Sequence, residues 1–162
     1  MKWQIHNLYG FLHTLTGMIA VISAIIILFS KKGTVLHKRM GYAYIVSMLV
    51  LNISAWGVME FFPGKPGPFH FGSLISLIFI FLGMYPVVRR RHYWLQKHYN
   101  FINGSVIGLF AAFFVEVAFR SFSDAAVIIG FTFGTSLLVT IIGAILIVRN
   151  RPKILPGSKI SG

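Results

Sequence analysis

The amino-acid sequence contains five long apolar stretches separated by short polar segments. A helix needs about 20 apolar residues to cross a hydrocarbon layer about 30 Å thick. Because lipid offers no partner for backbone amides, each stretch is expected to satisfy its own hydrogen bonds as an α-helix. The sequence therefore predicts an all-α integral membrane protein with five transmembrane helices. These run over about 8–29, 41–62, 69–88, 101–119 and 125–148.

Few charged residues are available to cover a water-soluble surface. Of the 162 residues, 56% are hydrophobic and 11% are charged, whereas a soluble domain carries about 25% charged residues. The chain has no cysteine, which excludes disulfides, thiolate metal sites and iron–sulfur clusters. We expect one transmembrane domain over residues 1–148 and a short basic tail over 149–162, in a bacterial inner or plasma membrane.

The basic residues fall mainly on one side of the predicted spans. Of the 15 Lys and Arg residues, 12 lie in the segments 31–39, 89–97 and 149–159. The positive-inside rule then places the N-terminus outside and the C-terminus in the cytoplasm, which requires an odd number of spans. Because the formal net charge of +12 sits in short segments beside the membrane, anionic lipids, and not nucleic acid, are the expected partners.

Histidines within the apolar stretches are candidate functional residues, because ionisable groups at membrane depth are costly and usually serve a function. In the first stretch, histidines and small residues recur at helical spacing. The residues on this face are His6, Gly10, His13, Gly17, Ala20 and Ala24. Small residues also let helices approach closely. His13 lies deeper in the span than His6, and His70 of the third stretch is the predicted outer partner of either.

A second pair of histidines is predicted at the inner side. His37 lies just before the second stretch and His98 just before the fourth, with His92 as an alternative ligand. Two imidazoles from alternate helices, with small residues beside them, are what axial ligation of a haem iron requires. We therefore predict one or two haem b groups, held by His13 with His70 and by His37 with His98. Four helices would form the core of the bundle, and the fifth would be peripheral.

Haem ligation predicts a transmembrane electron carrier or a haem-responsive oxidoreductase, with an electron donor or a quinone as partner. One alternative is a proton- or ion-coupled small transporter that uses His13 and Glu116, and another is a non-catalytic scaffold or subunit. Glu116 also has Arg120 four residues later, at the spacing of a helical ion pair. A divalent metal such as zinc is the alternative cofactor, with His13, His70, Glu116 and Glu60 as nitrogen and oxygen ligands.

Residues 31–44 carry a pattern that is found in known proteins. They read Lys-Lys-Gly-Thr-Val-Leu-His-Lys-Arg-Met-Gly-Tyr-Ala-Tyr. This segment resembles a family of small bacterial multi-span membrane proteins of unknown function, in which Lys-x-Gly-x-x-x-His-basic-x-x-Gly-x-x-Tyr joins the first two spans. The resemblance implies that His37, His13, and His92 or His98 are important. A looser similarity of layout to di-haem membrane cytochromes b implies histidine pairs from alternate helices, and layout alone does not fix function.

Overall fold

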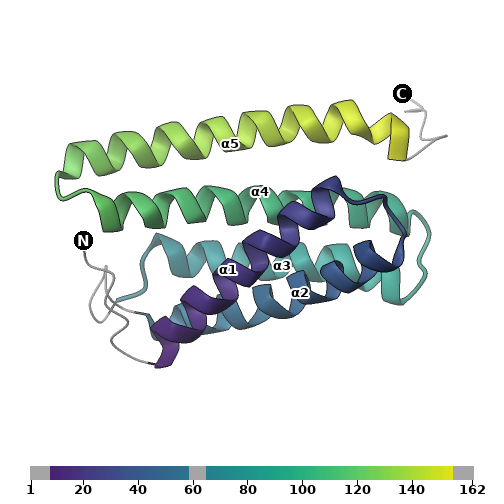
Figure 1. Ribbon diagram of the computed structural model, residues 1–162, viewed down its shortest axis with the longest axis horizontal. Coiled ribbons are helices and arrows are strands. Elements are labelled where there is room, and N and C mark those ends of the chain that lie inside the picture. The colour runs from purple at the N-terminus through teal and green to yellow at the C-terminus, as the bar shows by residue number, and fades with distance from the viewer. Residues whose placement is uncertain (1–7, 59–64, 155–162) are drawn as a thin grey trace. The chain divides into compact units, whose positions relative to one another are not determined.

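The computed structural model describes residues 8–58 and 65–154, with side chains described as far as residue 151 (Figure 1). This part of the chain contains five α-helices and one 3₁₀ turn, and all five helices are long and apolar enough to cross a membrane. The elements are α1 (Leu8–Phe29), α2 (Val35–Ser54), η1 (Ala55–Gly57), α3 (Pro68–Val88), α4 (Trp94–Ser121) and α5 (Ala125–Ile154). The predicted all-helical, five-span character is confirmed.

Several helices differ in their bounds from the apolar stretches that predict them. α4 and α5 are longer than predicted, whereas α2 begins and ends earlier, at Val35 and Ser54 instead of about 41 and 62. α2 begins at Val35 because the hydroxyl of Thr34 accepts a hydrogen bond from the backbone N–H of His37 (3.3 Å), which caps the helix. His37, expected just before the second span, therefore lies in the first turn of α2. α4 begins at Trp94, so His98 lies within this helix and not before it. Polar residues beside the hydrocarbon layer continue a helix without adding to its apolar stretch.

The chain divides into two compact units, and the division falls within α3. The N-terminal unit covers residues 2–78 and the C-terminal unit covers residues 79–162. α5 continues to Ile154, so the first residues of the predicted tail are helical. Each unit has its own helix–helix contacts.

In the N-terminal unit, α1 packs along α2 through the face of small residues that the sequence predicts. Ala20 and Ala24 of this face are fully buried. A Cβ atom added to Gly17 would lie 3.4 Å from the Cδ1 atom of Leu51, which is ordinary van der Waals contact. Small residues therefore allow the two helices to approach closely, as expected for helix pairs in membranes.

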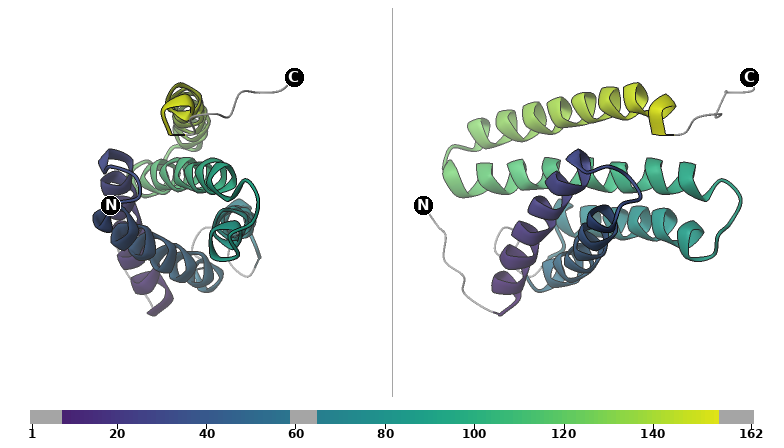
Figure 2. Two further views of the ribbon diagram at one scale, coloured as in Figure 1. Left: turned by 90° about the vertical axis from the view of Figure 1, so that its right-hand side faces the viewer. Right: turned by 45° about the vertical axis from the view of Figure 1, so that its right-hand side comes forward.

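In the C-terminal unit, α4 and α5 run side by side in opposite directions (Figures 1 and 2). The hydroxyl of Tyr99 on α4 donates a hydrogen bond to the backbone carbonyl of Ile147 on α5 (2.9 Å). The end of α3 packs on α4, where the rings of Phe79 and Phe101 meet edge to face with centroids 5.6 Å apart. No residue of α5 up to Arg151 is fully buried, so this helix presents most of its apolar surface outward.

Candidate functional site

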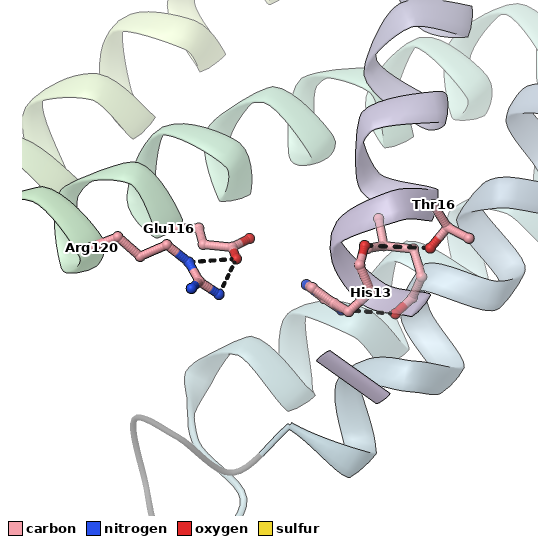
Figure 3. A network of polar contacts seen from close by, with 5 residues as sticks. His13, Thr16, Glu116 and Arg120 are labelled. Atoms are coloured by element: carbon pink, nitrogen blue, oxygen red, sulfur yellow. Dashed lines mark hydrogen bonds and ion pairs between the residues drawn. The ribbon is translucent and has the colours of Figure 1, made fainter. Parts of the chain in front are cut away.

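A backbone carbonyl near the end of α2 holds His13. The last turn of α2 gives way to η1, and the carbonyl of Leu51 accepts hydrogen bonds from the Ser54 hydroxyl (3.0 Å) and from Nδ1 of His13 (3.3 Å; Figure 3). A carbonyl oxygen can only accept, so Nδ1 of His13 carries a proton. In the neutral imidazole the lone pair then lies on Nε2.

His70 is held in the opposite tautomer at the start of α3. Pro68 begins this helix, a position that suits proline. His70 is the third residue of the helix, and its Nδ1 accepts the backbone N–H of Gly67 (2.9 Å). This bond resembles half of a capping box. Because Nδ1 accepts, the proton of the neutral ring lies on Nε2. His70 is only 4% exposed, and its Nε2 has no hydrogen-bond partner among the residues that the structure describes.

Trp56 and Ser73 join η1 to α3 beside His70. The indole N–H of Trp56 donates to the Ser73 hydroxyl (3.0 Å), which in turn donates to the backbone carbonyl of His70 (2.7 Å). The rings of Trp56 and His70 meet edge to face with centroids 5.4 Å apart. One helical turn along, the side-chain amide of Asn52 donates to the Ser76 hydroxyl (3.1 Å). Buried polar groups therefore link α2 and η1 to α3.

The structure brings His13 and His70 to the same short segment of the chain. His13 contacts Leu51, and His70 contacts Trp56, which lies five residues further along the chain. Five residues of helix correspond to a rise of about 7.5 Å along the axis. The two imidazoles come from α1 and α3, as the sequence predicts. In their neutral forms the two rings therefore carry the proton on different nitrogens, Nδ1 in His13 and Nε2 in His70.

His98 in the C-terminal unit repeats the arrangement of His13. Its Nδ1 donates to the backbone carbonyl of Gly83 on α3 (3.2 Å), so the lone pair of the neutral ring again lies on Nε2. A Cβ atom at Gly83 would lie 2.8 Å from Cδ1 and 3.3 Å from the backbone nitrogen of Ile102. The absence of a side chain at Gly83 therefore lets α3 approach α4 closely beside His98.

The remaining predicted histidines have other surroundings. His37 is half-buried in the first turn of α2, in the N-terminal unit, whereas its predicted partner His98 belongs to the C-terminal unit. His92 is exposed between α3 and α4, with its ring 3.9 Å from that of Tyr93. His6 and Glu60 lie outside the described residues.

Glu116 forms the predicted ion pair with Arg120. The guanidinium donates from Nε (3.0 Å) and Nη2 (2.8 Å) to one carboxylate oxygen of Glu116 (Figure 3). The Arg120 side chain is 11% exposed and that of Glu116 is 29% exposed. Within residues 8–58 and 65–154, no group of three or more His, Cys, Asp or Glu side chains is placed to hold a metal ion.

Comparison with known proteins identifies a family. Residues 3–151 match a family described as "predicted membrane protein (DUF2306)". The chain belongs to the DUF2306 family. This match confirms the predicted membership of an uncharacterised family of multi-span membrane proteins and the multi-pass membrane location. No curated protein and no solved structure matches the chain.

Several groups that shape the sites in this DUF2306 protein were missed in the sequence. The carbonyls of Leu51 and Gly83 are main-chain atoms, and no residue type announces that a carbonyl will accept a side-chain hydrogen bond. Trp56 and Ser73 fall close to a polar turn and give no periodic signal. The small size of Gly83 was the one available clue, because glycine often marks a close approach between helices.

Proposed function

We propose that this DUF2306 protein binds haem b and serves as a membrane electron carrier or oxidoreductase. The observation that carries the proposal is the shared arrangement of His13 and His98, each with Nδ1 donating to a main-chain carbonyl. Histidines that ligate metals almost always donate their other ring N–H in this way, which fixes the ring orientation and raises the basicity of the ligating nitrogen. Haem would supply one-electron redox chemistry, tuned by its axial ligands and by burial.

The residues of this chain would hold and orient the ligands. The carbonyl of Leu51 would set the imidazole plane of His13, and that of Gly83 would do the same for His98. The apolar helices would exclude water and provide a low dielectric. We assign His13 and His98 as the first candidate ligands, with His70 as the predicted partner of His13. For His70 to ligate through Nε2 as a neutral ring, its Nδ1 would have to release the N–H of Gly67.

The orientation and helix roles predicted from the sequence belong to the same proposal. We infer that the N-terminus is outside and the C-terminus cytoplasmic, because of the basic segments. A four-helix core with a peripheral fifth helix is supported by α5, which contains no fully buried residue up to Arg151. Anionic lipids at the basic side and a small electron donor or quinone are the proposed partners.

Optical spectroscopy of the purified protein tests the haem proposal. We expect a Soret band, as isolated or after incubation with haem, and a redox titration that shifts its position. His98→Ala and His13→Ala are expected to lose or displace this band, whereas the exposed His92→Ala serves as a matched control and should retain it. Circular dichroism of each variant checks that the helices remain. The absence of a Soret band after reconstitution, or bands indifferent to both substitutions, would refute the proposal.

The transporter alternative has weaker support. It requires Glu116 to take up and release protons, and this carboxylate accepts two hydrogen bonds from Arg120, as expected for a structural ion pair. Ion or proton flux in proteoliposomes that is abolished by both Glu116→Gln and His13→Ala would favour transport over electron transfer.

A further inference from the structure

The turn between α3 and α4 keeps two non-glycine residues in the left-handed backbone conformation. We call Arg89–Tyr93 the basic turn. Arg90 has φ of 45° and Tyr93 has φ of 57°. At the end of α3 the backbone N–H groups of Arg91 and Arg90 donate to the carbonyls of Pro86 (3.1 Å) and Val87 (3.3 Å). This is the Schellman arrangement, in which the left-handed position is usually glycine.

In the turn between α1 and α2, by contrast, the residue with positive φ is a glycine. Gly33, between α1 and α2, has φ of +82°, and no atom lies within 4 Å of the place that a Cβ atom would take. An arginine at the equivalent left-handed position of the basic turn is strained, since a Cβ atom there crowds the neighbouring carbonyl. Strained backbone of this kind is concentrated at functional sites. A function of the Arg90 guanidinium would therefore explain why an arginine, and not a glycine, occupies this strained position.

Positive charge accumulates at this end of the C-terminal unit. The hydrogen bond from Tyr99 to Ile147 places the end of α5 beside the start of α4. Six basic residues lie in or beside these segments: Arg89, Arg90, Arg91, Lys97, Arg149 and Arg151. The two acidic side chains of the described residues 79–154 lie at the opposite end of α4, where Glu116 pairs with Arg120 and Asp124 accepts the N–H of Val127. Within residues 79–154, which the structure describes, no carboxylate is near enough along α4 or α5 to neutralise the cluster.

Exposed aromatic side chains follow the arginines. Tyr93 is 65% exposed and Trp94 is 42% exposed. Tyrosine and tryptophan are enriched at the level of lipid headgroups, where one end of the ring is apolar and the other is polar. The basic turn and these two rings therefore combine the features of a segment that lies at the membrane–water interface.

We propose that the basic turn binds the phosphate groups of anionic phospholipids, and that Arg90 retains its strained conformation for this contact. The uncompensated positive charge selects an anionic partner, and the adjoining interfacial rings select one within the bilayer over a soluble anion. Each arginine near an anionic lipid surface is expected to strengthen binding about fivefold. The proposal does not depend on haem binding.

Native mass spectrometry of the detergent-solubilised protein tests this inference with phosphatidylglycerol and phosphatidylcholine of equal chain length. Arg90→Gly is expected to weaken phosphatidylglycerol binding about fivefold and at the same time to raise the thermal unfolding midpoint, because glycine removes the backbone strain. Arg90→Lys should keep most of the affinity. Lys65→Gln is the matched control, since it removes one exposed charge from the N-terminal unit and should leave lipid binding unchanged.

A triple variant, with Arg89, Arg90 and Arg91 each changed to Gln, should lose about a hundredfold in affinity for phosphatidylglycerol and most of the preference over phosphatidylcholine. Unchanged phosphatidylglycerol affinity in Arg90→Gly, or equal loss in Lys65→Gln, would overturn the proposal. Competition by millimolar inorganic phosphate as strong as that by the lipid would also overturn it, since the site would then take a soluble anion. A midpoint that does not rise in Arg90→Gly would show that Arg90 is not kept against strain.

Discussion

Replacing Gly83 with alanine tests the close approach of α3 and α4 that holds His98. The added Cβ atom would lie 2.8 Å from Cδ1, 2.9 Å from Cγ1 and 3.3 Å from the backbone nitrogen of Ile102. Carbon atoms are in favourable contact at about 3.5–4.0 Å, so side chain and backbone would both have to move. Ile102 is 9% exposed and has little room to withdraw.

The magnitude follows from two opposing effects. Alanine in a helix is favoured over glycine by up to about 1 kcal/mol, whereas overpacking a close contact typically costs about 1–3 kcal/mol. Gly72→Ala on the same helix is the control, because no atom lies within 4 Å of its Cβ position. The difference between the free energies of unfolding of the two variants therefore isolates the overpacking, and we expect Gly83→Ala to be less stable than Gly72→Ala by about 1–3 kcal/mol.

Reversible unfolding in mixed detergent micelles, followed by circular dichroism, measures this difference. Ile102→Ala removes the two closest side-chain atoms, so the double variant with Gly83→Ala should be more stable than the sum of the single effects, with a coupling of about 0.5–3 kcal/mol. Equal stability of Gly83→Ala and Gly72→Ala, or strict additivity with Ile102→Ala, would refute the close approach of the two helices. The hydrogen bond from His98 to the Gly83 carbonyl would then also lose its structural basis.

Two further predictions concern charged groups. Glu116→Gln and Arg120→Gln should each lower the thermal unfolding midpoint more than the double variant does. A single change leaves one charge of a partly buried pair without this partner, at a cost of up to about 3 kcal/mol. A double variant whose loss of stability equals the sum of the two single losses would contradict this. The ammonium of Lys32 donates to the carbonyls of Ile27 and Leu28, and burial lowers the pKa of Lys32 from its usual 10.5. The unfolded chain then binds more protons, so stability should rise with pH between the folded pKa and 10.5, with a slope that is reduced in Lys32→Gln.

The fold could be predicted largely from apolar length. The first and third helices agree with their predicted spans to within a residue, because their apolar runs begin and end where the helices do. The fourth helix starts earlier at Trp94, since residues 94–100 are mostly polar or amphipathic and continue the helix without a hydropathy signal. α2 starts earlier because of the cap at Thr34, a local hydrogen bond that an average over 20 residues does not detect.

For the candidate site, the sequence allowed the side chains to be predicted, but not the contacts that these side chains make. Helical spacing singled out His13 and the ion pair of Glu116 with Arg120, since both depend on positions within one helix. The tautomers of His13 and His70 depend on contacts with Leu51 and Gly67. The contact between His13 and Leu51 arises only when helices pack, and a spacing rule does not include it. The haem ligand pairs stay predictions, to be tested by the spectra described above.

The hydrogen bonds that hold His13 and His98 end on main-chain carbonyls, and this affects how the protein tolerates change. A side-chain acceptor can be lost in one substitution, whereas a carbonyl is present whatever residue occupies its position. At Leu51 the chain can therefore accept other side chains of similar volume without altering the orientation of the imidazole. At Gly83 the carbonyl would likewise remain an acceptor after a substitution, but the contact with Ile102 leaves no room for a side chain. Related chains are thus expected to keep these ring orientations even where the contacting residues differ.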